Sequence, residues 1–311
     1  MTTVTVARPV LIEEKAVRAG TKGGRQIKLK TQILSQIFCI AVAATVLFPL
    51  LWVLSMSIDP RNIARPDGLN LIPSGASLAA YQQVIAKPSL NPVSFLELAR
   101  NSLEISIIVS LFTLTLGSLA AYAMSRLHFR GRQVLMIAVL AVLMLPAVAE
   151  LAPLYVLEYS IRFGSFILGN SILGVAIAVS AGTLPFAIWN MKGYIDTIPR
   201  ELEEAASVDG ASKLQIFLWI VLPLAKPVLA VTAFFGFIAG WTEFYFSWMF
   251  LTNPKDFTLA MVLNGMVGQY GTTPWSQFAA FAVLVAIPVS AVYLLLQRYI
   301  VSGLALGGVK G

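Results

Sequence analysis

The sequence predicts an all-α membrane protein with six transmembrane helices and both termini in the cytoplasm. Three observations predict this fold class: an apolar composition, six long apolar runs, and an uneven distribution of basic residues. Of the 311 residues, 58% are hydrophobic and 12% are charged, and the mean hydropathy is +0.80. A soluble globular domain has about 25% charged residues. The composition therefore excludes an ordinary soluble domain and fits a chain that crosses a bilayer several times.

The six apolar runs are each long enough to cross a bilayer as a helix. A span needs about 20 residues, because each residue of a helix rises 1.5 Å and the hydrocarbon layer is roughly 30 Å thick. Prolines interrupt the third, fourth and sixth runs at Pro146, Pro185 and Pro288, where kinks are expected. The predicted spans are residues 33–58, 101–123, 134–157, 170–190, 224–250 and 276–299.

Basic residues set the predicted orientation. With the N-terminus in the cytoplasm, 16 of the 22 Lys and Arg residues fall on the cytoplasmic side and the other six fall outside. Positive charge favours the cytoplasmic side of a membrane protein. An even number of spans then places the C-terminus inside as well. This topology explains the net charge of +7 better than nucleic-acid binding does.

The spans divide the chain into segments. The first apolar run is too long for the core of a signal peptide, so it is expected to stay as an anchor. The loop that follows is rich in proline and is expected to hold a short helix near residues 78–85. The predicted segments are a basic cytoplasmic tail at 1–32, the first transmembrane helix at 33–58, a periplasmic loop at 59–99, a five-helix transmembrane core at 100–300 with a cytoplasmic loop at 191–226, and a C-terminal cytoplasmic tail at 301–311.

The cytoplasmic loop at 191–226 carries secondary-structure signals of its own. Thr197 is a candidate N-cap for a short helix, and Pro199 suits its first turn. Three acids then stand where the helix dipole favours negative charge. They are Glu201, Glu203 and Glu204.

Gly210 supplies the stop of this short helix, because glycine readily adopts the left-handed backbone of a helix end. Ser212 and Gln215 then have the spacing of a capping box, which opens a second helix. Pro223 marks the return to the next span. The apolar residues of the second helix are Leu214, Ile216, Phe217, Trp219 and Ile220.

One face of the short helix carries Leu202, Ala205, Ala206 and Asp209 at helical spacing. Two interpretations of this amphipathic helix are open: an anchor on lipid headgroups, or a docking surface for a partner protein. Surface anchors tend to be rich in Lys and Arg on the polar face. This helix has glutamates, which an anionic leaflet repels, so the residues favour partner docking.

The same segment resembles the EAA loop of permease subunits in ATP-binding-cassette importers. Glu204-Ala205-Ala206, Gly210 and Ile220-x-Leu222-Pro223 match its spacing, EAA-x3-G-x9-I-x-L-P. Residues 182–209 resemble the region that leads into the loop in carbohydrate importers. The end of the chain, 297–311, resembles the end of the smaller permease subunit of the maltose type. The resemblance runs from about residue 95 onward, and it implies the type I importer permease fold of the binding-protein-dependent inner-membrane component family.

The resemblance implies a function and a set of partners. The chain would be a non-catalytic permease subunit in a bacterial inner membrane, importing maltose, maltodextrin or a related oligosaccharide. Its partners would be a second related permease, two copies of a cytoplasmic ATPase subunit and an extracytoplasmic sugar-binding protein, with no cofactor. The ATPase-coupling residues implied are Glu203, Glu204, Ala205, Ala206, Asp209, Gly210, Leu222 and Pro223. The tail residues implied to contact the ATPase are Gly307, Gly308, Lys310 and Gly311.

Polar and small residues inside the spans form a second candidate site. A carboxylate within a span is costly and usually faces a partner or a water-filled cavity, which makes Glu243 a candidate for the translocation pathway or the partner permease. Gly240, Ser106 and Ser110 lie on small-residue faces and are assigned to the same site. Close packing between helices is an equally good explanation for such small residues.

The outer loop at 251–275 is the family's candidate for contact with the solute-binding protein. The residues assigned to this contact are Asn253, Gln269, Tyr270 and Trp275.

The sequence lacks the motifs that ATP binding and metal binding require. The sequence has no G-x-x-x-x-G-K-[ST] phosphate loop, and its single Cys39 and single His128 give no metal-ligand spacing. ATP hydrolysis would then belong to another subunit. Within the family, trehalose and glycerol phosphate remain alternative solutes. A stand-alone secondary transporter is a rival class, but the two halves show no convincing repeat.

Overall fold

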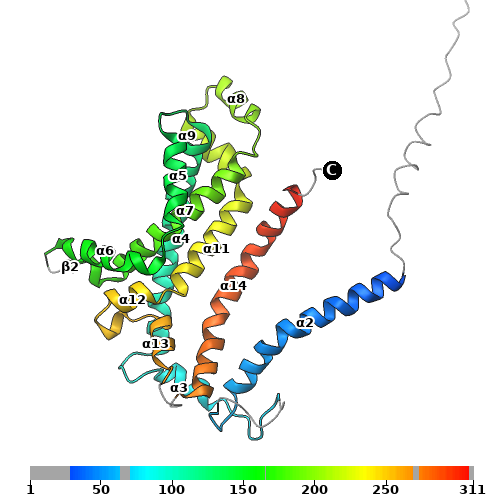
Figure 1. The fold of residues 1–311 in the computed structure, drawn as a ribbon, viewed down its shortest axis with the longest axis vertical. Coiled ribbons are helices and arrows are strands. Elements are labelled where there is room, and N and C mark those ends of the chain that lie inside the picture. Colours follow the sequence, from blue (N-terminus) through cyan, green and yellow to red (C-terminus); the bar gives the residue numbers. More distant parts are fainter. Residues whose placement is uncertain (1–28, 64–70, 165, 269–272, 308–311) are drawn as a thin grey trace, which may run out of the picture. The chain divides into compact units, whose positions relative to one another are not determined.

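Long helices form nearly all of the structure, a computed structural model that describes residues 29–63, 71–164, 166–268 and 273–307 (Figure 1). Among these residues, five helical segments are long and apolar enough to cross a membrane. They agree in position with the first, second, fourth, fifth and sixth predicted spans. The five segments are Leu29–Ser57, Phe95–Arg126, Ile172–Ile195, Lys226–Phe250 and Trp275–Tyr299.

The chain divides into two units, residues 1–51 and 52–311. The first unit contains most of α2 (Leu29–Ser57), an apolar helix with Pro49 inside it. The second unit contains the last turn of α2 and every other element. Most of the predicted tail at 1–32 lies outside the described residues.

The third predicted span, 134–157, is divided between α5 (Arg132–Val142) and α6 (Ala147–Ser160). Pro146 stands directly before α6 and has no N–H to donate, so it ends the hydrogen-bonding pattern of α5 rather than only bending it. Figure 1 shows α6 turning away from the direction of α5. The two helices have 11 and 14 residues, each too short to cross a bilayer alone. The predicted count of six spans is therefore not confirmed, while five are.

The fifth span is also interrupted. Helix α11 (Lys226–Trp241) ends three residues before α12 (Tyr245–Phe250) begins. Thr242 closes α11 by donating its hydroxyl to the Ile238 carbonyl at 2.9 Å. Together the two helices still make one segment of membrane-spanning length.

Helix α4 (Phe95–Arg126) is the central element of the second unit and packs most extensively against α7 (Ile172–Ile195) and α11. Small residues allow this close approach. A Cβ added at Gly240 of α11 would lie 2.6 Å from Ser106 Cα of α4, closer than any real contact. Polar contacts join the helices as well: the hydroxyls of Thr113 and Thr183 are 3.1 Å apart. Close packing of small residues and such hydrogen bonds are what holds helices together where the solvent is lipid.

Shorter elements cover the end of the bundle that lies opposite α8 (Glu201–Val208) (Figure 1). Helix α3 (Ala79–Ala86) confirms the short helix expected near residues 78–85. A two-stranded hairpin pairs Arg162 with Ile167 and was not predicted. The elements at this end and beside it are β1 (Arg162–Phe163), β2 (Phe166–Ile167), η1 (Leu168–Asn170), η3 (Pro254–Asp256), α13 (Leu259–Gly265) and the start of α14 (Trp275–Gly307).

Candidate functional site

The segment between α7 and α11 folds over one end of the bundle, with α8 at its outermost point (Figure 1). The predicted start of this helix is wrong. Thr197 donates its hydroxyl to the Tyr194 carbonyl at 2.7 Å, so it closes α7 instead of capping α8, which begins at Glu201. The three acids still occupy the first turn of α8. Their position near the N–H groups of the helix start is the favourable one for negative charge.

The predicted turn is confirmed. Gly210 has φ +87°, a left-handed conformation that costs any residue with a Cβ. Beyond it, the backbone N–H of Ser212 donates to Gln215 Oε1 at 2.8 Å, and the backbone N–H of Gln215 donates to Ser212 Oγ at 3.3 Å. This capping box opens α9 (Lys213–Ile216) as expected.

The second helix of the segment contains a π-helical turn, η2 (Phe217–Val221), before it continues as α10 (Leu222–Leu224). Pro223 explains the irregularity, because it lacks the N–H that an α-helix would donate to the Trp219 carbonyl. Leu222 is half-buried against the apolar cluster at this end of the bundle, whereas Pro223 is exposed.

The predicted apolar face of α8 points outward. Leu202 is 46% exposed, Ala205 and Asp209 are also exposed, and Val208 just before the turn is 88% exposed. Ala206 turns inward onto the apolar cluster formed by the ends of α4, α7 and α11. In α9 and η2, Leu214 and Trp219 are 61% and 75% exposed. The outer surface of this segment therefore carries large apolar side chains among polar and charged ones, and nothing in the described chain covers them.

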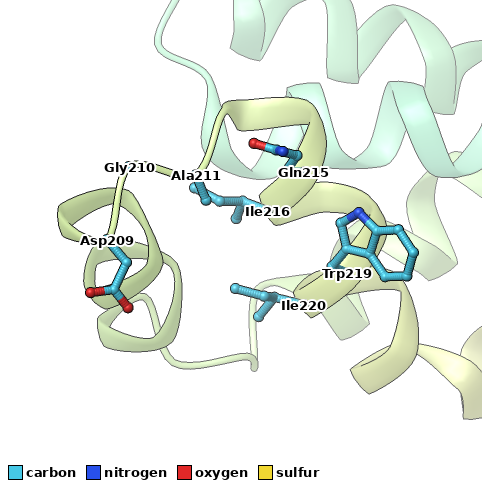
Figure 2. A pocket seen from close by; sticks show the side chains of 7 residues that line it. All are labelled: Asp209, Gly210, Ala211, Gln215, Ile216, Trp219 and Ile220. Atoms are coloured by element: carbon cyan, nitrogen blue, oxygen red, sulfur yellow. The ribbon is translucent and has the colours of Figure 1, made fainter.

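A pocket of about 370 Å³ lies at the turn between α8 and the second helix (Figure 2). Asp209, Gly210 and Ala211 form its wall on the α8 side, and Trp219 and Ile220 extend into it from the other helix. It is an open, mixed polar and apolar depression. Two of its seven lining residues, Asp209 and Gly210, belong to the set that the sequence assigned to ATPase coupling.

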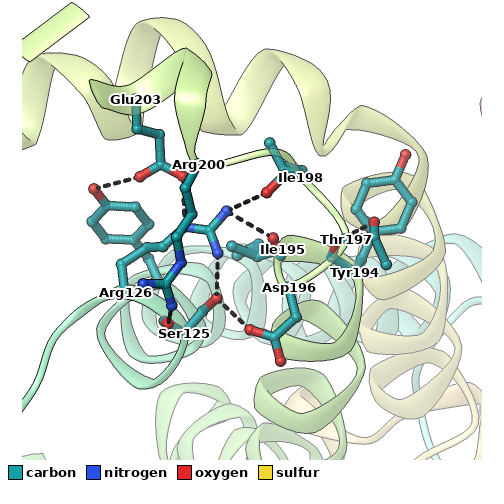
Figure 3. A network of polar contacts seen from close by, with 10 residues as sticks. Ser125, Arg126, Tyr194, Ile195, Asp196, Thr197, Ile198, Arg200 and Glu203 are labelled. Atoms are coloured by element: carbon teal, nitrogen blue, oxygen red, sulfur yellow. Dashed lines mark hydrogen bonds and ion pairs between the residues drawn. The ribbon is translucent and has the colours of Figure 1, made fainter. Parts of the chain in front are cut away.

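The two adjacent glutamates of α8 face different surroundings. Glu204 is exposed, and its contact with a partner stays a prediction. Glu203 is turned inward, with its side chain only 12% exposed, and its carboxylate accepts a hydrogen bond from Arg126 Nε at 2.5 Å (Figure 3). Tyr122 donates to the other carboxylate oxygen at 3.4 Å. Glu203 therefore binds the bundle, and a direct contact between Glu203 and an ATPase stays a prediction.

Further polar contacts surround this ion pair at the end of α7 (Figure 3). Ser125 donates to Asp196 Oδ1 at 2.5 Å, and Lys192 donates to Asp196 Oδ2 at 2.5 Å. Partial burial works to raise the pKa of Asp196, but the hydrogen bonds from Lys192 and Ser125 outweigh it, so the pKa lies below its ordinary value. Asp196 is accordingly ionised at neutral pH and balances the positive charge beside it.

Sequence reasoning did not find Arg126 or Asp196. Arg126 counted only as one of the basic residues that set the orientation. The signal that was present is a set of complementary charges: a basic residue at the end of the second span and acids in the loop after the fourth. Arg126 and Glu203 are 77 positions apart, and no local pattern in the sequence indicates that they form an ion pair.

The structure brings Gly240, Ser106 and Ser110 together inside the chain. Ser106 is fully buried and donates its hydroxyl to the Ser102 carbonyl, and Ser110 donates to the Ala233 carbonyl of α11 at 3.0 Å. The helix-packing explanation therefore accounts for these residues. Their assignment to a pathway or a partner permease stays a prediction.

Glu243 lies in the break between α11 and α12. Its carboxylate accepts a hydrogen bond from the Phe246 backbone N–H at 2.6 Å, so it caps the short helix that follows. This contact gives the carboxylate a partner within the chain. A pathway or partner role for Glu243 stays a prediction as well.

The remaining predicted contacts are only partly described. Asn253 accepts from the Lys255 N–H at 3.2 Å and opens η3, and Trp275 is the first residue of α14. Gly307 is the last residue of α14. The residues outside the described chain are Gln269, Tyr270, Gly308, Lys310 and Gly311.

Known proteins resemble this chain over most of its length. The trehalose/maltose transport system permease protein MalG of Thermococcus litoralis is 35% identical over 282 residues, which cover 90% of this chain and 97% of that protein. The maltose/maltodextrin permease MalG of Yersinia pestis is 37% identical and covers 86% of this chain and 90% of its own. The galactooligosaccharides permease GanQ of Bacillus subtilis is 34% identical and covers 94% of this chain and 99% of its own.

Solved structures show the same fold. A chain of a bacterial ABC transporter for import of the acidic polysaccharide alginate superposes with a TM-score of 0.67 at 23% identity, covering 86% of this chain and 96% of that one. A second structure of the alginate transporter, in complex with a pentasaccharide-bound periplasmic protein, gives a TM-score of 0.61 at 15% identity. At this identity the likeness concerns the fold alone, which is that of ABC importer permeases.

The family described as "Binding-protein-dependent transport system inner membrane component" matches residues 113–305, more than half of the chain and all of the segment around α8. That description and the membrane-spanning helices agree on a multi-pass component of the inner membrane. The chain therefore belongs to the family of binding-protein-dependent transport system inner membrane components.

Proposed function

We propose that this chain is one of two membrane-spanning permease subunits of an ATP-driven importer for maltose, maltodextrin or a related oligosaccharide. The names of its relatives support a sugar, since they mention trehalose, maltose, maltodextrin and galactooligosaccharides. The chain itself has no phosphate loop, so ATP hydrolysis belongs to a separate ATPase subunit, present in two copies. A second, related permease completes the pathway, and an extracytoplasmic binding protein delivers the sugar.

The observation that carries the proposal is the exposed apolar surface of α8 and η2. Large apolar side chains there, such as Val208 and Trp219, are 88% and 75% exposed at a membrane boundary. Exposed apolar surface rimmed by polar residues marks protein interaction sites. The glutamates on the same helix disfavour lipid headgroups as the partner. A soluble ATPase docked on this surface satisfies both facts.

The solute has two alternatives within the same class. Trehalose is one, because the T. litoralis relative is named for trehalose and maltose together. A sugar-like solute such as glycerol phosphate is the other. A stand-alone secondary transporter is a rival from a different class, and it would leave the apolar surface of α8 without a purpose.

The decisive experiment is purification and reconstitution. The chain is tagged and expressed in its own host, and the complex that purifies with it is placed in vesicles with ATP inside and the binding protein outside. We expect the tag to bring down an ATPase and a second permease, and radiolabelled maltodextrin, maltose or trehalose to enter only with hydrolysable ATP. Uptake by the isolated chain driven by an ion gradient would contradict the proposal and support the secondary transporter.

A further inference from the structure

Arg126 joins three elements at the α8 end of the bundle. It is the last residue of α4, and its guanidinium donates to two backbone carbonyls at the end of α7: Nη2 lies 3.0 Å from the Ile195 oxygen and 2.8 Å from the Ile198 oxygen. Its Nε donates to Glu203 of α8 at 2.5 Å. One planar, forked side chain thus holds α4, α7 and α8 together, a geometry that arginine offers and lysine does not.

The ion pair between Arg126 and Glu203 is largely shielded from solvent. The side chain of Arg126 is 7% exposed and that of Glu203 is 12% exposed. Removing one partner of a buried ion pair destabilises a protein, because the other charge is left buried and uncompensated. The guanidinium also donates to the Ile198 carbonyl just beyond α7 and to the Ile195 carbonyl, which accepts from the Ile198 N–H as well. Removal of the guanidinium would therefore break its contact with α8 and its contacts with the Ile195 and Ile198 carbonyls at the same time.

Helix α8 has few other attachments. Among the described residues, both of the side-chain hydrogen bonds between α8 and the rest of the bundle end on Glu203, one from Arg126 and one from Tyr122. Besides them, Ala206 packs against the apolar cluster. Short non-helical turns connect α8 to its neighbours on both sides, at residues 196–200 and 209–212. Without the ion pair, α8 would keep its packing against α9 and η2 and the bond from Arg200 to the Ser125 carbonyl at 3.4 Å, but it would lose its charged contact with α4.

We propose that Arg126 is a positioning residue that makes α8 move as one body with the adjoining ends of α4 and α7. This inference rests on the proposed function, in which α8 docks on the ATPase. A displacement of α8 by the ATPase then reaches two membrane-spanning helices directly. The alternative is that the turns at both ends of α8 flex and absorb the displacement.

The first test measures sugar transported per ATP hydrolysed in the reconstituted complex. We expect Arg126→Gln to lower this ratio by about tenfold, within the range by which single residues change the coupling between two sites. Glu203→Gln should lower it in the same direction, and the double variant should be no worse than Arg126→Gln alone, because both changes remove one interaction. Arg126→Lys should recover part of the ratio. Arg130, exposed in the loop after α4, provides the matched control Arg130→Gln, which should leave the ratio unchanged.

The second test measures whether α8 and α4 move together. Spin labels are placed on Val208 of α8 and on His128 after α4, both exposed, in a chain where Cys39 is replaced by Ser. We expect the distance between the labels to be the same in the ATP-free and ATP-bound complexes. In Arg126→Gln the distribution should broaden or shift between the two states. A residue that served only stability would lower the yield of complex without changing this distance or the ratio.

Two results would overturn the inference: an unchanged transport ratio in an assembled Arg126→Gln complex, or a label distance that changes with ATP in the unsubstituted complex. If Arg126→Gln does not assemble, Glu203→Gln and Arg126→Lys give the same two readouts. A failure of the proposed function looks different, because the unsubstituted complex would then import no sugar at all.

Discussion

Glu203 and Glu204 are neighbours in α8, but their side chains lie in opposite surroundings. The first is buried against Arg126, and the second is exposed. Residues next to each other in a helix point about 100° apart, so one can face the bundle while the other faces a partner. A family resemblance that assigns both to one contact cannot separate the two roles. The separation comes from the contacts of Glu203 with Arg126 and Tyr122 of α4.

The two glutamates are therefore expected to respond differently to charge reversal. Glu204→Lys should leave the fold intact and weaken ATPase docking, because the side chain is exposed and only the partner meets the new charge. Glu203→Lys should lower the yield of folded protein, because it buries a second positive charge beside Arg126. The measurement is the amount of ATPase recovered per mole of purified permease. Full recovery with Glu204→Lys would remove Glu204 from the docking surface.

Gly240 is a residue where a single methyl group should matter. The added Cβ of Gly240→Ala would lie 2.6 Å from Ser106 Cα, and backbone atoms cannot move aside cheaply. We expect a loss of about 1–3 kcal/mol in the free energy of unfolding, the usual cost of overpacking, seen as a lower Tm of the purified complex. Gly193→Ala in α7 is the control, since nothing lies within 4 Å of its added Cβ. Equal Tm values for the two variants would contradict the packing role.

Asp196 gives a pH dependence with a definite sign. Its pKa is below the ordinary value in the folded chain, because its hydrogen bonds with Lys192 and Ser125 outweigh partial burial. The folded state therefore binds protons less readily than the unfolded state. The stabilisation is fully present above the ordinary pKa of about 4 and is lost as the pH falls through the depressed value.

The measurement compares the Tm of the complex with that of Asp196→Asn as a function of pH. We expect a constant difference from pH 6 to 8 and a smaller one as the pH falls below about 4. A difference that shrinks already between pH 7 and 6 would show that another group controls this network.

At the scale of elements, the turn after α8 depends on one glycine. The φ of +87° at Gly210 is left-handed, and alanine there costs about 1 kcal/mol or more. Gly210→Ala should strain the angle between α8 and α9 and lower sugar uptake and sugar-stimulated ATP hydrolysis, while the complex still assembles. Gly131→Ala introduces the same kind of strain at φ +85°, before α5, and serves as the control. Normal coupling in Gly210→Ala would show that the angle of this turn is unimportant.

The sequence predicted elements well wherever the signal was local. The Gly210 turn and the Ser212 capping box depend on residues within a few positions of one another, and both are present. The break of the third span at Pro146 was expected only as a kink. Hydropathy averages over a whole window, so it cannot tell a bent helix from two helices joined by a short turn. That choice depends on what α5 and α6 pack against.

The contacts that were missed are those between distant residues. Arg126 and Glu203 are 77 positions apart, and the Thr113 and Thr183 hydroxyls are 70 apart. Small and polar residues on one face of a span fit both helix packing and a transport pathway, and only the arrangement of α4 against α11 shows that Ser106 and Gly240 pack against each other. Composition and motif spacing contain no such three-dimensional contacts.

At the scale of the whole second unit, different polar contacts stabilise the two ends of the bundle. The α8 end has the buried network around Arg126. At the other end, the segment after α2 is bonded to the start of α14: Asn62 Oδ1 accepts from the Ser276 N–H at 2.9 Å, and the Ser276 hydroxyl donates to the Asp59 carbonyl at 2.5 Å. These bonds join positions more than 200 residues apart and connect the segment after α2 to the start of α14.

Asn62 itself should be sensitive to replacement. It has φ +56°, the left-handed region that asparagine tolerates better than most residues, and its side chain caps a backbone N–H of α14. Asn62→Ala removes the cap and adds strain, whereas Asn62→Gly removes only the cap. We expect both to lower the Tm of the complex, with the alanine variant about 1 kcal/mol less stable than the glycine variant. A glycine variant less stable than the alanine variant would show that backbone strain at Asn62 is not a cost.

The π-helical turn at Phe217–Val221 has a consequence for comparing relatives of this chain. Such a turn contains one more residue than an α-helical turn, so it absorbs a single-residue insertion without disturbing the helix on either side. A relative that lacks one residue here would form a regular helix. Its side chains before and after that point would then face the same directions as the corresponding side chains of this chain. An alignment gap of one position at 217–221 would thus record the loss of the π-helical turn alone, and not a loss of the segment or a change in the faces of the flanking helices.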